Sequence, residues 1–140
     1  MTKYVLGFAF DMPAESVEDG VPRVALIRKN RPAWQAGKLN GIGGHIEKGE
    51  DAYDAMVREF EEETGYLRLA WNRYAKMYGR DFEVYVFRSF GAPLNMLRST
   101  TDEKVGIYSS GNLPDDVLFN LRWLIPLARE TRNYHVEVPI

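Results

Sequence analysis

The sequence lacks several features that would point to other classes of protein. It contains no cysteine, which excludes a disulfide framework, a thiolate nucleophile and a cysteine-ligated zinc or iron–sulfur site. Basic residues are not in excess, because 18 Lys and Arg stand against 20 Asp and Glu, for a formal net charge of -2. Binding to a nucleic-acid polymer depends on neutralising many phosphates, so we expect no such partner.

Long apolar runs are also missing. No stretch has the length and apolar composition that would span a bilayer. The first residues lack the apolar core and small-residue cleavage site of a signal peptide. We therefore expect no membrane partner and a cytoplasmic location.

What the sequence does contain is the balance of an ordinary globular protein. Hydrophobic residues make up 45% of the 140 residues and charged residues 27%. This length can bury a sizeable core but is short for two domains. We predict a single domain over residues 1–140.

Residues rich in β-branched and aromatic side chains predict the strands of an α/β fold. The predicted strands are 4–10, 23–29, 67–78, 82–90 and 104–109, the third and fourth forming a hairpin around Gly79-Arg80-Asp81. Residues 34–46 carry four glycines and predict a shaped loop with short extended pieces. Strands flanked by two unlike helices indicate a mixed β-sheet sandwiched between helices.

Two helices are predicted from their capping residues and apolar spacing. Asp51 can cap a first helix that runs to Thr64, and Gly65 suits the left-handed residue that ends it. The face that we expect to pack on the core consists of Tyr53, Met56, Val57, Phe60 and Thr64. The second helix is predicted over 117–129, with Pro126 ending or bending it.

The first helix carries an acidic face. Glu59, Glu62 and Glu63 stand at positions i, i+3 and i+4, so their carboxylates converge on one side of the helix. Like charges at this spacing repel by a few tenths of a kcal/mol per pair, and no lysine lies among them. The plain alternative is a solvated helix face, which most charge runs are. A hard cation such as Mg²⁺ prefers oxygen ligands and keeps sites for water and phosphate, so a metal site is the sharper hypothesis.

Neighbouring residues support the metal hypothesis. Arg58 can hold carboxylates by paired hydrogen bonds and, with Glu50, keep the ligands aimed. The glycines of 41–44 let the backbone approach a metal ion or phosphate closely. We take Arg58, Glu50 and the three glutamates as the candidate catalytic residues.

These residues resemble the signature of the Nudix family. That signature is glycine, five residues, glutamate, seven residues, Arg-Glu, a bulky apolar residue, any residue, Glu-Glu, any residue, glycine and a bulky apolar residue. The matching positions are Gly44, Glu50, Arg58, Glu59, Phe60, Glu62, Glu63 and Gly65. Tyr66 stands where an aliphatic residue is usual, which affects only packing. So many fixed positions at fixed spacing make the resemblance specific, although it covers only residues 44–66.

The resemblance implies a Nudix-type α/β/α sandwich and a hydrolase that cuts a diphosphate linkage with water. It implies Mg²⁺ or Mn²⁺ as cofactor, held by the carbonyl of Gly44 and by Glu59, Glu62 and Glu63. Glu59 is the candidate general base, and Glu103 in a later loop is the alternative. The partner would be a small nucleotide substrate, and the family likeness allows a homodimer.

A weaker resemblance concerns the substrate. Asn40 and Gly43, with Asp115 and Asp116, look like the purine-binding elements of Nudix enzymes that remove oxidised nucleoside triphosphates, and Trp34 is placed to stack on a base. The structural alternative is that Asn40 shapes a turn and an aspartate caps the second helix. A nucleoside triphosphate, modified or not, is the predicted substrate; ADP-ribose or a nucleotide sugar is the alternative. A non-catalytic Nudix-like nucleotide sensor is the competing function.

Overall fold

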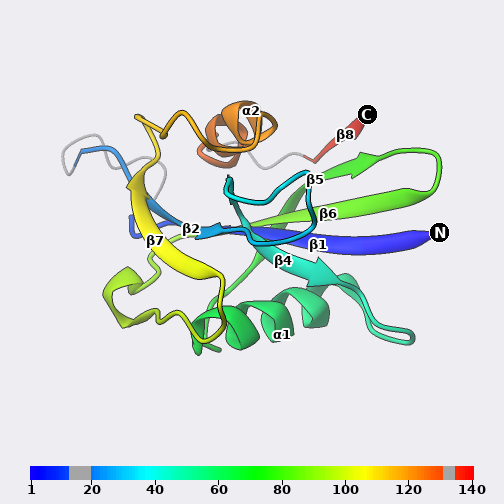
Figure 1. The fold of residues 1–140 in the computed structure, drawn as a ribbon, viewed down its shortest axis with the longest axis horizontal. Helices are drawn as coiled ribbons and strands as arrows, with labels where there is room; N and C mark the ends of the chain where they lie inside the picture. The colour runs from blue at the N-terminus through cyan, green and yellow to red at the C-terminus, as the bar shows by residue number, and fades with distance from the viewer. Residues whose placement is uncertain (13–19, 131–134) are drawn as a thin grey trace.

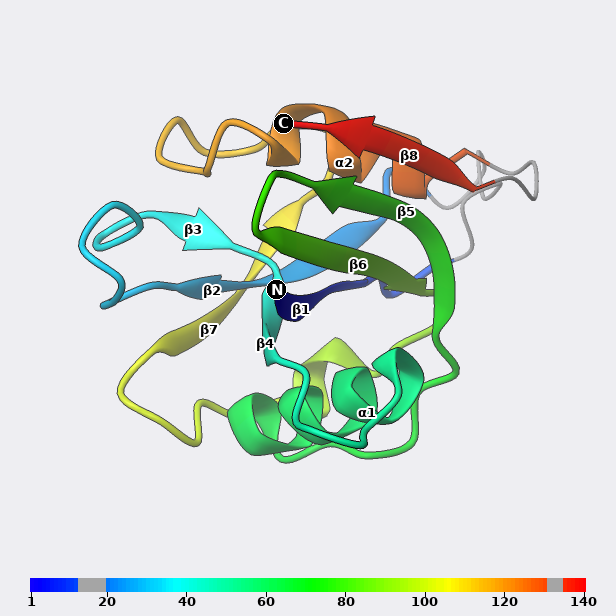
Figure 2. The ribbon, with the colours of Figure 1, turned by 90° about the vertical axis from the view of Figure 1, so that its right-hand side faces the viewer.

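The chain folds into two sheets held between two helices (Figures 1 and 2). The computed structural model describes residues 1–12, 20–130 and 135–140. The elements are β1 (Thr2–Ala9), β2 (Arg23–Arg28), β3 (Leu39–Asn40), β4 (Ile42–His45), α1 (Ala52–Thr64), β5 (Asn72–Tyr78), β6 (Phe82–Ser89), the 3-10 helix η1 (Leu94–Met96), β7 (Lys104–Ser109), α2 (Leu121–Ala128) and β8 (Val136–Pro139).

The larger sheet is mixed, as predicted. Its five strands run in the order β4-β1-β6-β5-β8. The pairs β1 with β6 and β5 with β8 are parallel, whereas β4 with β1 and β5 with β6 are antiparallel. A second, antiparallel sheet has the order β3-β2-β7, and a bridge between Phe10 and Val24 joins the two sheets. The helices α1 and α2 lie on opposite sides of the strands (Figure 1).

Alternating side chains of β1 divide the interior into two cores. Leu6, Phe8 and Phe10 join the core beneath α2. Val5 and Ala9 point the other way and join the core beneath α1. This is the period-two pattern of a strand that is buried on both faces. The central strand therefore holds both helices to the same frame.

The caps of α1 form as predicted. The side chain of Asp51 accepts a hydrogen bond of 2.8 Å from the amide of Asp54. Gly65 has a φ of 76° and donates its N–H to the carbonyl of Glu61, which ends the helix. Phe60 is buried on the expected face, but Tyr53 is 44% exposed and meets Phe87 in an edge-to-face arrangement. The prediction for Tyr53 was therefore wrong in placing it in the core.

Two predicted boundaries were also wrong. The strand expected over 67–78 begins at Asn72, because Trp71 is buried instead against Phe60 beneath α1. The helix expected over 117–129 begins at Leu121, since the preceding residues lie beside β3, where the amide of Leu118 donates to the carbonyl of Leu39. Pro126 lies inside α2, which continues for two residues beyond it. No bounds were predicted for the short strand β8.

Tests of the core beneath α1 centre on Phe60. Its side chain is 1% exposed and its ring meets Trp71 edge-on at 5.1 Å. We expect Phe60→Ala to lower the free energy of unfolding by about 3–5 kcal/mol in urea denaturation. Phe119→Ala is the matched control, because Phe119 is 82% exposed. Its cost should stay within about 0.5 kcal/mol, and equal losses for the two variants would contradict this packing.

Candidate active site

Arg58 is the centre of the ionic contacts on α1. Its Nε and Nη2 donate to the two carboxylate oxygens of Glu50 at 2.8 and 2.9 Å. Its remaining hydrogen bonds go to Glu59 Oε1 at 2.9 Å, to Glu62 Oε1 at 3.3 Å and to the backbone carbonyl of His45 at 2.9 Å. The hydrogen bonds from Arg58 lower the pKa of Glu50 to about 2. Arg58 thus joins the end of β4 and the loop before α1 to the acidic face.

Gly44 leaves room for the carboxylate of Glu59. A Cβ added at Gly44 would lie 2.5 Å from both carboxylate oxygens of Glu59. Any side chain at this position would therefore displace the carboxylate. The need for glycine here comes from the close approach of β4 to α1, which places the backbone of Gly44 beside a candidate metal ligand.

The need for glycine at position 43 has a different structural reason. A Cβ at Gly43 would lie 1.9 Å from the backbone oxygen of Val5 on the neighbouring strand β1. Gly43 pairs with Leu6 in the antiparallel register of β1 and β4. Its absence of a side chain is therefore explained by strand packing, and its predicted contact with substrate stays a prediction.

The acidic side chains of α1 are close enough to affect one another. Burial raises the pKa of Glu59, and the charges of Glu62 and Glu63 add to that rise. Burial also raises the pKa of Glu63, with further contributions from the charges of Glu103 and Glu62. Negative charge is thus gathered where water solvates it poorly, and a cation would relieve the repulsion.

The donor set suits a hard divalent cation, but the carboxylates are not closed around one point. Within residues 1–12, 20–130 and 135–140, no three acidic or histidine side chains form a ready chelate. Glu59 and Glu62 are turned toward Arg58, and Glu63 toward Thr101. Carboxylate and carbonyl oxygens are the ligands that Mg²⁺ and Mn²⁺ prefer. The second oxygen of each carboxylate takes part in none of these bonds, so the residues fit such an ion if small movements bring those oxygens of Glu59, Glu62 and Glu63 together with the bonds kept.

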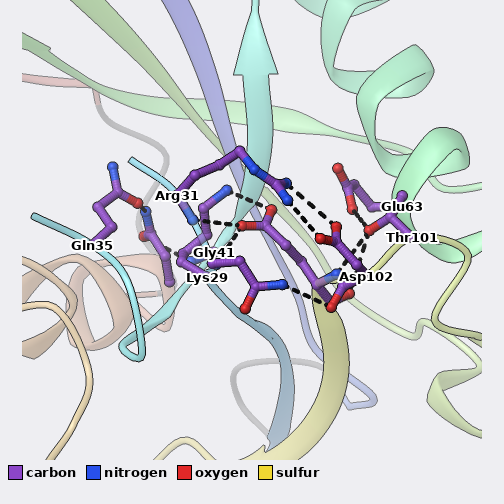
Figure 3. A network of polar contacts seen from close by, with 10 residues as sticks. Lys29, Arg31, Gln35, Gly41, Glu63, Thr101 and Asp102 are labelled. Atoms are coloured by element: carbon purple, nitrogen blue, oxygen red, sulfur yellow. Dashed lines mark hydrogen bonds and ion pairs between the residues drawn. The ribbon is translucent and has the colours of Figure 1, made fainter. Parts of the chain in front are cut away.

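Glu103, the alternative general base, is buried and bound on both oxygens. Its side chain accepts from Lys29 Nζ at 2.8 Å and from the amides of Asn30 and Arg31 at 2.6 and 3.3 Å (Figure 3). Burial alone would raise the pKa of Glu103, but the bonds from Lys29 and the two amides lower it overall. Glu103 therefore fixes the chain after β2 to the loop before β7. The free oxygen that a base needs is better placed on Glu59.

Sequence reasoning missed the loop residues around Glu63. Thr101 Oγ1 donates to Glu63 Oε2 at 2.9 Å, and Arg31 forms an ion pair with Asp102 (Figure 3). These residues lie 38 or more positions from their partners. No local spacing in the sequence signals such contacts.

The candidate base-binding residues come from two segments that lie side by side. The amide of Leu39 donates to the carbonyl of Asp116 at 3.0 Å, which brings Asn40 near 115–116. Asn40 Oδ1 accepts from the amide of Gly41 at 2.8 Å, and its Nδ2 donates to Gln35 at 3.1 Å. These bonds support the alternative that Asn40 shapes the turn.

The two aspartates do not cap α2. Its N-cap residue is Asn120, without a side-chain cap bond, so the capping alternative was wrong. Asp116 instead pairs with Arg28, which also donates to the carbonyl of Gly37 at 3.0 Å. Arg28 was not predicted at this place. Trp34, in the turn before β3, is 69% exposed and open to a stacking partner.

Comparison with known proteins gives the class. The NUDIX domain family matches residues 10–118, most of the chain. No curated protein matches the chain significantly. The chain belongs to the Nudix family, so the predicted family is confirmed.

Solved structures share the fold at low sequence identity. The MutT protein of Bacillus halodurans aligns with a TM-score of 0.72 at 14% identity, over 99% of this chain and 90% of its own. The NUDIX domain of Shewanella oneidensis NrtR, solved with ADP ribose, gives 0.72 at 14% identity, over 91% and 85%. A MutT/nudix protein of Enterococcus faecalis gives 0.62 at 18%, over 77% of this chain; the chain spans only 43% of that protein. The predicted α/β/α fold is confirmed.

The described part of the chain contains no helix long and apolar enough to cross a membrane. The longest helix there, α1, has 13 residues and an acidic face.

The two adjacent glycines of β4 offer a paired test. We expect Gly43→Ala to destabilise the fold by about 1–3 kcal/mol, because its Cβ would strike the backbone of β1. Gly44→Ala should leave unfolding nearly unchanged, since the neighbour that must move is the side chain of Glu59. Its pyrophosphohydrolase activity should fall on the order of 10-fold or more. For both variants, urea denaturation gives the free energy of unfolding and product release gives the activity. If both variants lost only stability, this account would be refuted.

Proposed function

We propose that this chain hydrolyses a nucleoside triphosphate, with an unmodified or oxidised base, to a nucleoside monophosphate and pyrophosphate, using Mg²⁺ or Mn²⁺. The observation that carries the proposal is the partly buried acidic face of α1, with the carboxylate of Glu59 packed against the backbone of Gly44. In the reaction, the oxygen of water bonds to phosphorus and the bridging P–O bond breaks. The water loses a proton as its oxygen bonds to phosphorus.

The residues of the chain take distinct roles in this proposal. Glu59, Glu62, Glu63 and the carbonyl of Gly44 hold the cation, which supplies charge neutralisation on the diphosphate and activates water. Glu59 accepts the proton on Oε2, since Oε1 accepts from Arg58. Arg58, fixed by Glu50, limits the directions in which Glu59 and Glu62 can turn.

Base recognition is the less constrained part of the proposal. Trp34 offers an exposed ring in the turn before β3, and Asn40, Asp115 and Asp116 supply polar groups on the adjoining segments. The pairing of Asp116 with Arg28 means that a base would compete with a guanidinium for that carboxylate. ADP-ribose or a nucleotide sugar is the second substrate class, because the related NrtR domain was solved with ADP ribose.

A nucleotide sensor without turnover is the competing function. Such a domain would be free to lose metal carboxylates, whereas this chain keeps Glu59, Glu62 and Glu63 together with Arg58 and Glu50. The retained set favours catalysis.

A substrate panel tests the proposal directly. Purified protein with Mg²⁺ or Mn²⁺ is incubated with nucleoside triphosphates, their 8-oxo forms, ADP-ribose, nucleotide sugars and dinucleoside polyphosphates, and the products are separated by ion-exchange chromatography. We expect monophosphate and pyrophosphate from a triphosphate only when metal is present. Fastest turnover of ADP-ribose would overturn the triphosphate assignment but keep the reaction class, and no turnover of any compound would favour the sensor.

Two glutamates on α1 provide a matched pair of variants. We expect Glu63→Gln to lose more activity than the roughly 10- to 100-fold typical for an outer partner of a metal ligand, because it removes a charged ligand. Its fold should persist, since burial already disfavours the charge of Glu63. Glu61→Gln, on the exposed side of the same helix, should behave as wild type.

Metal binding by Glu63→Gln and Glu61→Gln can also be compared without substrate. A ligand at 100 times its dissociation constant stabilises a fold by about 2.7 kcal/mol, so Mn²⁺ should raise the melting temperature of wild type and Glu61→Gln more than that of Glu63→Gln. Equal activity and equal metal response in both variants would reject Glu63 as a ligand.

A further inference from the structure

The side chain of Glu63 has a partner that the family signature does not include. Thr101 Oγ1 lies 2.9 Å from Glu63 Oε2 (Figure 3). The hydroxyl carries one proton, and its only other acceptor contact among the described residues, the carbonyl of Glu103, is longer at 3.5 Å. The amide of Glu103 donates to Thr101 Oγ1 at 3.2 Å. The hydroxyl is thus directed toward the carboxylate of Glu63.

The loop that carries Thr101 is anchored by a buried carboxylate. Glu103 is 3% exposed and accepts hydrogen bonds from Lys29 Nζ at 2.8 Å and from the amide of Asn30 at 2.6 Å. Lys29 and Asn30 directly follow β2, so the loop is tied to the end of a central strand. Two further contacts fix the loop to α1: the amide of Thr100 donates to the carbonyl of Glu63 at 3.3 Å, and the hydroxyl of Thr100 to the carbonyl of Glu62.

We propose that Thr101 is a positioning residue that orients Glu63 toward the divalent cation, with Glu103 as the anchor of its loop. This inference rests on the proposed metal-dependent function. A glutamate on a helix surface samples several rotamers, and fixing one costs side-chain entropy. The hydroxyl bond to Oε2 restricts that freedom before the ion arrives and leaves Oε1 to face it. Partners of this kind typically change metal affinity 10- to 100-fold when removed.

Two substitutions separate the hydroxyl of Thr101 from the rest of its side chain. Thr101→Val keeps the shape and removes the hydroxyl, and Thr101→Ser keeps the hydroxyl. Mn²⁺ binding is measured without substrate by electron paramagnetic resonance, and the Mn²⁺ dependence of turnover by steady-state kinetics. The melting temperature of each metal-free variant reports folding.

We expect Thr101→Val to weaken Mn²⁺ binding about 10-fold. The metal concentration for half-maximal turnover should rise in parallel, and turnover at saturating metal should fall less. Thr101→Ser should bind Mn²⁺ as wild type does. Because the side chain of Thr101 is exposed, Val should not unfold the protein; if it does, Thr101→Ala provides the same comparison.

Two results would overturn the inference, in distinguishable ways. Wild-type Mn²⁺ affinity in Thr101→Val, with wild type itself binding and active, removes the role of Thr101 and leaves the proposed function standing. Wild-type protein that binds no Mn²⁺ removes the proposed function and this inference together. A loss of affinity in Thr101→Ser equal to that in Thr101→Val would also contradict the inference, because the hydroxyl would then be irrelevant.

Discussion

Negative charge that is partly removed from water, on one face of α1, is the constraint around which this molecule is arranged. Glu59 and Glu63 lose solvation and both feel the charge of Glu62, which raises the pKa of both carboxylates. Arg58 offsets part of that cost by hydrogen bonds to Glu50, Glu59 and Glu62. One guanidinium does not balance several carboxylates, so the site keeps a demand for further positive charge. A divalent cation, as the proposed function requires, would meet that demand.

The rest of the fold serves to hold this face against backbone. β1 is buried on both sides, carries β4 in antiparallel register and packs against both helices through alternating side chains. That register places Gly44 opposite Val5 and leaves the space in which the carboxylate of Glu59 lies. Phe60 fixes the rotation of α1 by filling the core on its other side. The stability of the fold and the geometry of the site therefore both depend on how α1 packs against β1 and β4.

The parts that sequence could predict are those set by local spacing. The i, i+3, i+4 carboxylates, the Asp51 cap and the Gly65 end of α1 follow from helix geometry, and the structure has the cap and the end as predicted. The contacts that could not be predicted join distant segments: Lys29 to Glu103, Thr101 to Glu63 and Arg28 to Asp116 lie 74, 38 and 88 positions apart. The start of α2 was misplaced for the same reason, because apolar residues at 117–118 pack beside β3 rather than extend the helix. Tertiary packing decides where such elements begin, and the hydrophobic periodicity of the sequence does not report that packing.

The central claim is that the carboxylates of α1 turn inward to share a cation in front of Gly44. The most direct measurement is a crystal structure with Mn²⁺ and a non-hydrolysable nucleoside triphosphate, with the ion located by its anomalous scattering. The account predicts Mn²⁺ bound by Glu59, Glu62, Glu63 and the carbonyl of Gly44, with diphosphate oxygens completing its coordination. An anomalous peak elsewhere, or nucleotide bound with no ion between these carboxylates, would contradict it.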